Sequence, residues 1–194
     1  MSNDSPLYLQ PSRTATALAW LGGDQPGALP EDPDLRGWLE DTGSLTARLR
    51  SACLAGFRLE LLGETIEPAP PDARTLADSS GALRARRVRM FCGQRLCVCA
   101  TTLIPPATLA GEPWLAGLGD RPLGDALLER GGIRRSPFLY ARAPADHPLF
   151  AVALEGADIR PNPIWARQST FRLAAGPLLV YEIFLPDLTR CGSP

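Results

Sequence analysis

The sequence predicts an α+β fold, a single domain in which short helices come first and an antiparallel β-sheet follows. Helical signals cover 34–40 and the stretch after Ser44, whereas most later segments have the composition and alternation of strands. Two pairs of these strands are separated by turns short enough for hairpins, which favours antiparallel pairing. Neither an internal repeat nor a strand–helix–strand alternation is present, so a parallel sheet is not expected.

The two helical segments are recognised by their boundaries and by the spacing of their apolar residues. The first covers 34–40. Ser44 is a suitable N-cap for the second, in which Leu45, Leu49 and Cys53 recur at i, i+4 and i+8. This spacing places the three apolar side chains on one face of a helix.

The strands are expected where alternating or β-branched residues run between turn-forming residues. Residues 93–95 would turn one hairpin, and 175–176 would turn another. Short helical signals at 113–115 and 122–128 interrupt the strands, and 144–163 allows no assignment. The expected strands are 57–66, 83–92, 96–104, 133–141, 164–174 and 177–185.

Length and composition divide the chain into two parts. A chain of 194 residues buries one sizeable core, so a single domain is the simplest arrangement. Residues 1–33 are rich in Pro, Gly, Ser and Asp, and we expect a poorly ordered or loosely packed lead-in there. The folded domain is expected to cover 34–190.

Charge and residue usage exclude several classes of function. The formal net charge is -1 and no DNA-binding motif is evident, so nucleic acid is not an expected partner. All 20 basic residues are arginine, which removes lysine Schiff-base chemistry. A glycine-rich phosphate-binding motif is also missing, and a nucleotide cofactor therefore has no evident site.

The cysteines and the single histidine give no metal-binding pattern. The 5 cysteines are odd in number and lack metal-ligand spacing, and His147 stands alone in a Pro-rich stretch. Cys97 and Cys99 would share one face of a strand as small core side chains. Because no signal peptide and no apolar run of about 20 residues is apparent, we expect a cytoplasmic protein in a reduced setting, without a membrane span.

Two charged residues are notable because each lies on the inward face of a strand. The period-2 rule places Arg86 on the side of Val88 and Met90, and Glu182 is the sole charge in the last strand. A lone buried charge costs on the order of several kcal/mol unless it is paired. The two residues therefore form either a buried structural pair or the polar groups of a closed apolar pocket for a small anion.

Five segments, taken in order, form a recognisable series. They are Trp38-Leu39 with Gly43–Leu49, Arg86–Met90, Ile104-Pro105 with Thr108-Leu109, Leu118–Gly124, and Trp165–Ser169 with Pro177–Pro186. Their order and spacing resemble the chorismate pyruvate-lyase family over roughly Trp38 to Pro186.

This resemblance implies both an activity and a fold. It implies a carbon–oxygen lyase that splits chorismate into 4-hydroxybenzoate and pyruvate, the first step toward ubiquinone. It implies a monomeric antiparallel-sheet domain with an enclosed ligand site beneath short helical flaps. It also implies that neither a metal nor an organic cofactor takes part.

The resemblance further assigns ligand contacts to four residues. Arg86 opens the strand motif and would bind the ring carboxylate, helped by the backbone N–H of Leu123. Glu182 precedes the Phe-Leu-Pro ending and would lie near the ether oxygen, either as a proton donor or as a hydrogen-bonding anchor. Leu45 stands where the best-known member has methionine, and it would form an apolar wall.

Chorismate also carries an enolpyruvyl carboxylate, which needs a cation of its own. Arg167 is the candidate, since it shares a strand face with Trp165 and Phe171. The alternative role for Arg167 is structural, stacked on Trp165 and bound to carbonyl groups.

Three hypotheses remain open. The leading one is a cofactor-independent lyase. The second is a non-catalytic binder of a small aromatic acid, and two departures from the family pattern bear on it: Thr101 replaces an arginine, and Arg87 replaces a glutamate. The third is a structural core in which Arg86 and Glu182 pair with each other.

Overall fold

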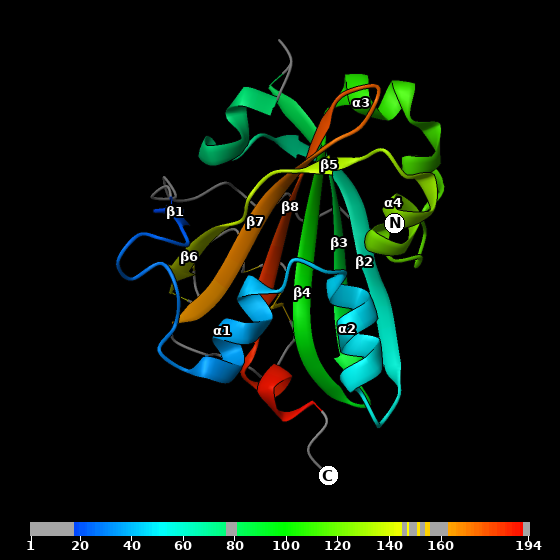
Figure 1. The fold of residues 1–194 in the computed structure, drawn as a ribbon. Coiled ribbons are helices and arrows are strands. Elements are labelled where there is room, and N and C mark those ends of the chain that lie inside the picture. Colours follow the sequence, from blue (N-terminus) through cyan, green and yellow to red (C-terminus); the bar gives the residue numbers. More distant parts are fainter. Residues whose placement is uncertain are drawn as a thin grey trace, which may run out of the picture.

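The computed structural model describes residues 18–76, 81–144, 147, 151, 154–155 and 163–191, and these form one antiparallel sheet with short helices (Figure 1). The strands are β1 (Leu21–Gly22), β2 (Phe57–Pro68), β3 (Ala82–Cys92), β4 (Arg95–Ile104), β5 (Arg134–Arg135), β6 (Leu139–Ala143), β7 (Ile164–Arg172) and β8 (Pro177–Phe184). The α-helices are α1 (Pro33–Glu40), α2 (Leu45–Ala52), α3 (Pro106–Gly111) and α4 (Leu123–Arg130). The 3-10 helices are η1 (Pro71–Leu76), η2 (Pro113–Gly117) and η3 (Pro186–Arg190).

The sheet brings both predicted hairpins together. Its strand order is β1-β6-β7-β8-β4-β3-β2, and β5 pairs with β7 beyond this path. The hairpin β3–β4 meets the hairpin β7–β8 through antiparallel pairing of β4 with β8. The predicted fold class, an α+β domain built on an antiparallel sheet, is thereby confirmed.

Helices α1 and α2 cover one face of the sheet, which we call the inner face (Figure 1). Asp32 caps α1 by accepting hydrogen bonds from two backbone N–H groups, and Pro33 occupies the first helical position. Ser44 caps α2, as predicted, by accepting from a backbone N–H of the first turn at 3.2 Å. Leu39 and Leu49 are fully buried beneath the two helices. Helices this short depend on such caps and packing for their stability.

The opposite, outer face of the sheet is covered by η1 and by the segment before α1. Trp20 stacks on Tyr181 with ring centroids 5.6 Å apart, and its indole N–H donates to Asp72 at 2.6 Å. Of the expected lead-in, 1–17 lies outside the described residues. The remainder, 18–33, includes β1 and these contacts to the sheet.

Two of the differences from the sequence prediction are explained by proline. The expected strand 133–141 is divided into β5 and β6, because Pro137 between them has no N–H to donate to a ladder. Helix α3 is unpredicted, since the expected strand ended at 104 and the next helical signal began at 113. Pro106 instead begins the helix, where its missing N–H costs nothing.

The prediction that Cys97 and Cys99 share one face is wrong, although both side chains are buried. A register shift between Met90 and Phe91 leaves Cys97 in a bulge of the β3–β4 ladder. Cys97 consequently packs into the core under α1 and α2, whereas Cys99 packs into another cluster with Ile183.

A disulfide joins Cys53, just after α2, to Cys92 at the end of β3, with Cα atoms 5.3 Å apart. This pair differs from the reduced state expected from the sequence. A second contact places the sulfur of Cys97 2.9 Å from that of Cys191, where β4 meets η3. Helix α2 is thus attached to the sheet by a covalent bond as well as by packing.

Candidate active site

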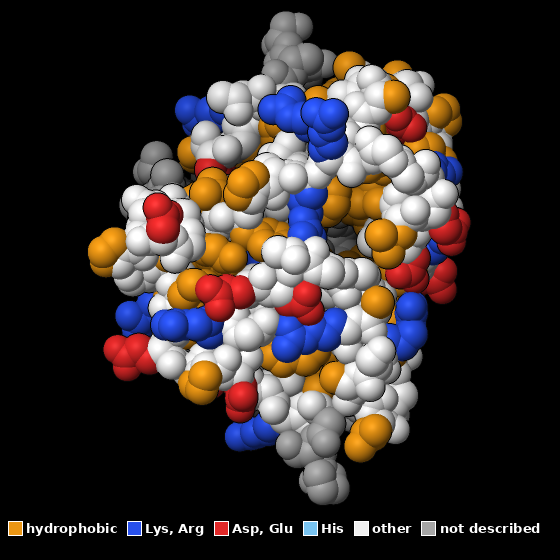
Figure 2. All heavy atoms as spheres, in the orientation of Figure 1, with side chains coloured by type: hydrophobic (Ala, Val, Ile, Leu, Met, Phe, Trp, Pro, Cys, Tyr) orange, Lys and Arg blue, Asp and Glu red, His pale blue; other side chains and the backbone are white. Residues whose placement is uncertain are grey.

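A cavity of about 390 Å³ lies between the inner face of the sheet and the helices α2 and α4. Strands β3, β4 and β8 form its floor. Figure 2 shows a hollow between these elements with hydrophobic side chains in its walls and basic side chains beside it, which are arginines because the chain has no lysine. The volume suits a small molecule. The lining residues are 42–46, Leu59, Arg86, Val88, Met90, Ala100, Thr102, 122–124, Leu127, Leu128, 131–133, Arg135, Phe171, Val180 and Glu182.

Arg86 lies on the inner face, as the strand periodicity predicted, and is only 2% exposed. Its Nη2 donates to the carbonyl oxygens of Gly119 at 2.8 Å and Arg121 at 2.9 Å. Burial lowers the pKa of Arg86 from its ordinary value, and the charges of Glu64 and Asp120 oppose that shift. The nearer recorded carboxylate oxygen, on Glu64, is 3.9 Å from Nε. Within the described residues, Glu64 is therefore a distant ion-pair partner of this guanidinium, and Arg86 Nε makes no hydrogen bond.

The segment that Arg86 binds leads directly into helix α4. Gly119 has φ of 53°, a left-handed conformation that glycine adopts without strain. Pro122 is the N-cap and makes no side-chain hydrogen bond to the helix, and Leu123 is the first helical residue. The helix therefore presents unsatisfied backbone N–H groups and the positive end of its dipole at the cavity. This position suits the ligand-binding role predicted for the Leu123 backbone.

Glu182 lines the cavity, and its partner is Arg167 rather than Arg86. Arg167 and Glu182 are directly opposite in the β7–β8 ladder, and Arg167 Nε donates to Glu182 Oε2 at 2.5 Å. The hypothesis that Arg86 and Glu182 neutralise each other is therefore wrong. The ion pair instead holds the Glu182 carboxylate in one orientation at the cavity floor.

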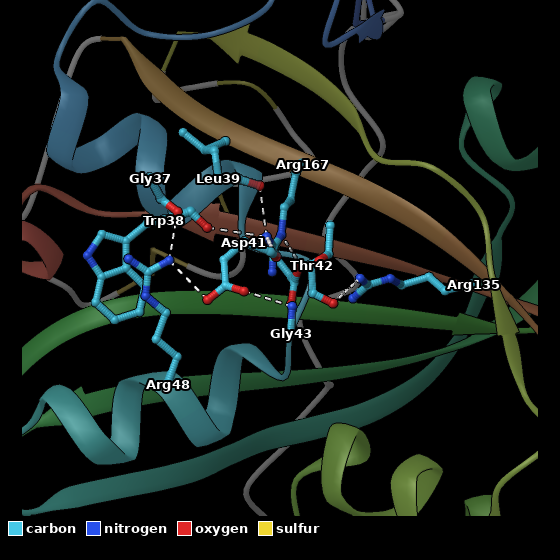
Figure 3. A network of polar contacts seen from close by, with 10 residues as sticks. Gly37, Trp38, Leu39, Asp41, Thr42, Gly43, Arg48, Arg135 and Arg167 are labelled. Carbon is cyan, nitrogen blue, oxygen red and sulfur yellow. Dashed lines mark hydrogen bonds and ion pairs between the residues drawn. The ribbon is translucent and has the colours of Figure 1, made fainter.

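Besides its bond to Glu182, Arg167 is held by backbone carbonyl groups at the end of α1 (Figure 3). Its Nη1 donates to the carbonyl oxygens of Trp38 at 3.2 Å, Leu39 at 2.8 Å and Asp41 at 2.8 Å. Its guanidinium carbon lies 4.0 Å from the ring centroid of Phe138 and 5.3 Å from that of Phe184, so its aromatic neighbours differ from the expected Trp165. Arg167 is not among the lining residues, so its geometry favours the structural role over contact with a ligand carboxylate.

Two more arginines hold 41–44, the segment between α1 and α2 (Figure 3). Arg48 Nη1 donates to the carboxylate of Asp41 at 3.0 Å. Arg135 Nη2 donates to the carbonyl oxygen of Thr42. Because residues 42–44 line the cavity, these arginines define part of its rim.

The groups around Asp41 lower the pKa of its carboxyl group. Burial tends to raise the pKa of Asp41, but the N–H of Gly43, the hydrogen bond and charge of Arg48, and the charge of Arg167 lower it below the ordinary value of 3.8. The carboxylate is thus stabilised in its ionised form.

Leu45 and the two departures from the family pattern lie on different sides of the sheet. Leu45 is buried in the cavity wall at the start of α2. Thr101 and Arg87 are paired across the β3–β4 ladder, and neither lines the cavity, whereas the neighbouring Thr102 does. Arg87 donates to Glu67 at 2.6 Å. The substitutions at 87 and 101 therefore lie outside the cavity lining.

Arg135 is a cavity residue that the sequence analysis missed. It belongs to the two-residue strand β5 and lies opposite Phe171 of β7. A strand this short has no periodicity from which an inward direction can be inferred. The sequence offered one indication, the adjacent pair Arg134 and Arg135. In a strand, side chains alternate between the two faces, so one of the two arginines must face the core.

The described residues provide neither a metal-binding cluster nor a membrane-spanning helix. In the part of the chain that the structure describes, no group of three or more His, Cys, Asp or Glu side chains is arranged to hold a metal ion. No helix within the same residues has the length and apolar character to cross a bilayer. The charged groups at the cavity are Arg86, Arg135 and Glu182.

These features define an α+β domain with a small-molecule cavity that contains a buried arginine and lies against an antiparallel sheet. The model of the chorismate lyase family matches residues 15–190, and the chain belongs to this family. A probable chorismate pyruvate-lyase of Thiobacillus denitrificans is 39% identical over 172 residues, covering 87% of this chain and 89% of the relative. A probable chorismate pyruvate-lyase of Cupriavidus metallidurans is 37% identical over 183 residues, with coverage of 86% and 81%.

Solved structures resemble the fold at low sequence identity. The effector domain of PhnF from Mycobacterium smegmatis superposes with a TM-score of 0.55 at 18% identity, covering 75% of this chain and 90% of that domain. A longer PhnF structure from the same organism gives a TM-score of 0.56 at 17% identity, covering 76% of this chain and 65% of that one. At such identity the likeness concerns the fold alone.

Proposed function

We propose that this protein cleaves chorismate into 4-hydroxybenzoate and pyruvate. The observation that carries the proposal is Arg86, a buried cation on the floor of an apolar cavity, with its nearer recorded carboxylate 3.9 Å from Nε. Such a group is costly unless an anionic ligand compensates it. Membership of the chorismate lyase family supports chorismate as the anion.

In this proposal, Arg86 and the start of α4 bind the ring carboxylate together. The guanidinium already donates from Nη2 to the carbonyl oxygens of Gly119 and Arg121. This contact fixes the orientation of its remaining N–H groups. The backbone N–H of Leu123, at the first position of α4, adds a second donor. Donors fixed before the substrate arrives cost no reorganisation during the reaction.

The chemistry needs no redox change. The bond between ring carbon C3 and the ether oxygen breaks, ring carbon C4 loses its hydrogen, and the methylene carbon of the enolpyruvyl group gains one to become the methyl of pyruvate. The ring becomes aromatic, and its 4-hydroxyl becomes the phenol. Enzyme catalysis of such a downhill reaction consists mainly of orientation and charge stabilisation. The proposal therefore assigns no cofactor.

Glu182 suits the role of an anchor in this reaction. Its carboxylate is fixed by Arg167 at 2.5 Å and faces the cavity. A carboxylate held in this way accepts a hydrogen bond from a hydroxyl group, and the 4-hydroxyl of the ring is a suitable donor. The hypothesis of a proton donor is less compatible with a carboxylate that already accepts a bond from an arginine.

The finer assignments belong to the same proposal. We infer a monomeric cytoplasmic enzyme whose aromatic product enters ubiquinone synthesis, as the family resemblance implies. A non-catalytic binder of a small aromatic acid would use the same cavity and remains the competing outcome.

The test is to mix the purified, metal-free protein with chorismate and to follow pyruvate and 4-hydroxybenzoate together. Equal release of both, lost in Arg86→Ala and strongly reduced in Glu182→Gln, is expected. Arg87→Ala is the matched control, because its side chain leaves the same strand on the outer face. Intact chorismate, with a melting temperature raised by 4-hydroxybenzoate, would instead identify a binder.

A further inference from the structure

We propose that Arg135, rather than Arg167, binds the second carboxylate of the substrate, the one on the departing enolpyruvyl group. This inference rests on the proposed function and adds the residue that distinguishes a dicarboxylate substrate from a monocarboxylate product. It arises from three observations: the position of Arg135, its incomplete set of partners, and its place relative to the other charged groups of the cavity.

The first observation is the position of Arg135. Its side chain lines the cavity and is partly buried, whereas the side chain of the adjacent Arg134 is exposed. The guanidinium carbon lies 4.3 Å from the ring centroid of Phe138 and 5.9 Å from that of Phe171. The two rings and the bond to the Thr42 carbonyl fix the side chain at the cavity wall. A ligand carboxylate would therefore meet a pre-ordered cation.

The second observation is the set of partners. Within the described residues, no ion pair between Arg135 and a carboxylate is recorded at 4.0 Å or less. Burial and the nearby charge of Arg167 lower the pKa of Arg135, while Glu182, Asp41 and Tyr140 act in the opposite direction. An incoming anion would relieve both unfavourable effects. Arg167, in contrast, already has a carboxylate partner and three carbonyl groups.

The third observation is the order of charges across the sheet. Arg135 is on β5 and Arg86 on β3, with β7, β8 and β4 between them, so Glu182 on β8 belongs to the middle strand of the five. The backbones of β5 and β3 are four strand spacings apart, which is about 19 Å. The distance between the two guanidinium groups is shorter where both side chains extend toward the cavity. In strand order the carboxylate thus lies between the two cations. This suits a ligand that carries two carboxylates and a hydroxyl group.

The decisive experiment compares a dianion with a monoanion on matched variants. In Arg135→Ala, kcat/KM for chorismate is expected to fall about 10- to 100-fold, while the affinity for 4-hydroxybenzoate, measured by calorimetry, changes less than about threefold. Arg134→Ala is the control, since it removes the exposed neighbour and should alter neither quantity. Equal losses for chorismate and 4-hydroxybenzoate, or no loss for chorismate, would overturn the assignment.

Two further variants separate ligand binding from support of the rim. Arg135→Gln keeps a donor for the Thr42 carbonyl without the charge, and Arg135→Lys keeps the charge. Ligand binding predicts that lysine recovers part of the chorismate activity and glutamine does not. Recovery with glutamine would mean that Arg135 merely supports 41–44, and the assignment would fail. If the wild-type protein releases no pyruvate, the proposed function fails as well, whereas a wild-type enzyme that is active and indifferent to Arg135 refutes this inference alone.

Discussion

Two segments border the cavity, and they are held in opposite ways. Segment 41–44 receives hydrogen bonds from three arginines, Arg48, Arg135 and Arg167, of which only Arg135 lines the cavity. Segment 119–122 is held through two of its carbonyl groups by Arg86, which also lines the cavity. In the first case two of the three supporting arginines lie outside the cavity lining, and in the second the supporting arginine is itself a cavity residue.

This difference has a consequence for mutagenesis. A substitution at Arg167 or Arg48 should loosen one rim while leaving the charge that faces the ligand in place. A substitution at Arg86 should affect the rim and the ligand together. The two segments thus allow stability and activity to be separated on one side of the cavity and not on the other.

The largest effect is expected at Arg167. Arg167→Ala leaves Glu182 and three carbonyl groups without their buried donor, so the free energy of unfolding should fall by about 3–5 kcal/mol. Urea denaturation would measure the change. Arg172→Ala, at the exposed end of the same strand, is the control and should shift the free energy by less than about 0.5 kcal/mol. A loss at Arg167 no greater than that at Arg172 would contradict the structural role.

Arg86→Lys sharpens the comparison on the other side. Lysine keeps the positive charge but lacks the planar fork that reaches two carbonyl groups and a ligand at once. We expect kcat/KM for chorismate to fall about 10- to 100-fold, together with faster proteolysis of segment 119–122. Steady-state kinetics and limited digestion would be run in parallel. Loss of activity with unchanged digestion would mean that the two roles of Arg86 can be separated after all.

The smallest effect concerns Asp41 and pH. The pKa of Asp41 is lower in the folded protein than its ordinary value of 3.8. Its contribution is therefore complete above that value and is lost as the pH falls through the lower folded pKa. Asp41→Asn should cost about 1 kcal/mol at pH 7, and the difference from wild type should shrink as the pH falls below 3.8. Denaturation curves at pH 7 and pH 3 would show it, and a constant difference would refute the assignment.

The fold and the first two site residues were accessible from the sequence, because both depend on alternation. Alternation assigns a residue to the same face wherever the strand is taken to begin or end. Arg86 and Glu182 were therefore placed on the inner face. Their partners were not accessible, because partners depend on register. A turn limited to 175–176 would have set Arg167 opposite Phe184, whereas the observed turn spans 173–176 and sets Arg167 opposite Glu182.

Arg135 shows a different limit. Its strand contains two residues and exists only because it pairs with the end of β7. No local propensity specifies such an element, since its stability derives from the sheet it joins. Residues of this kind reach a site through tertiary pairing, and a motif search that follows long strands passes over them.

The Cys53–Cys92 bond closes the chain between these residues into a loop that contains β2 and most of β3. A single protease cut anywhere from residue 54 to residue 91 would therefore yield two fragments that migrate as one molecule on a gel without reductant. They would separate once the bond is reduced. The floor strand that carries Arg86 would remain tethered to the helix above the cavity after its own chain had been severed.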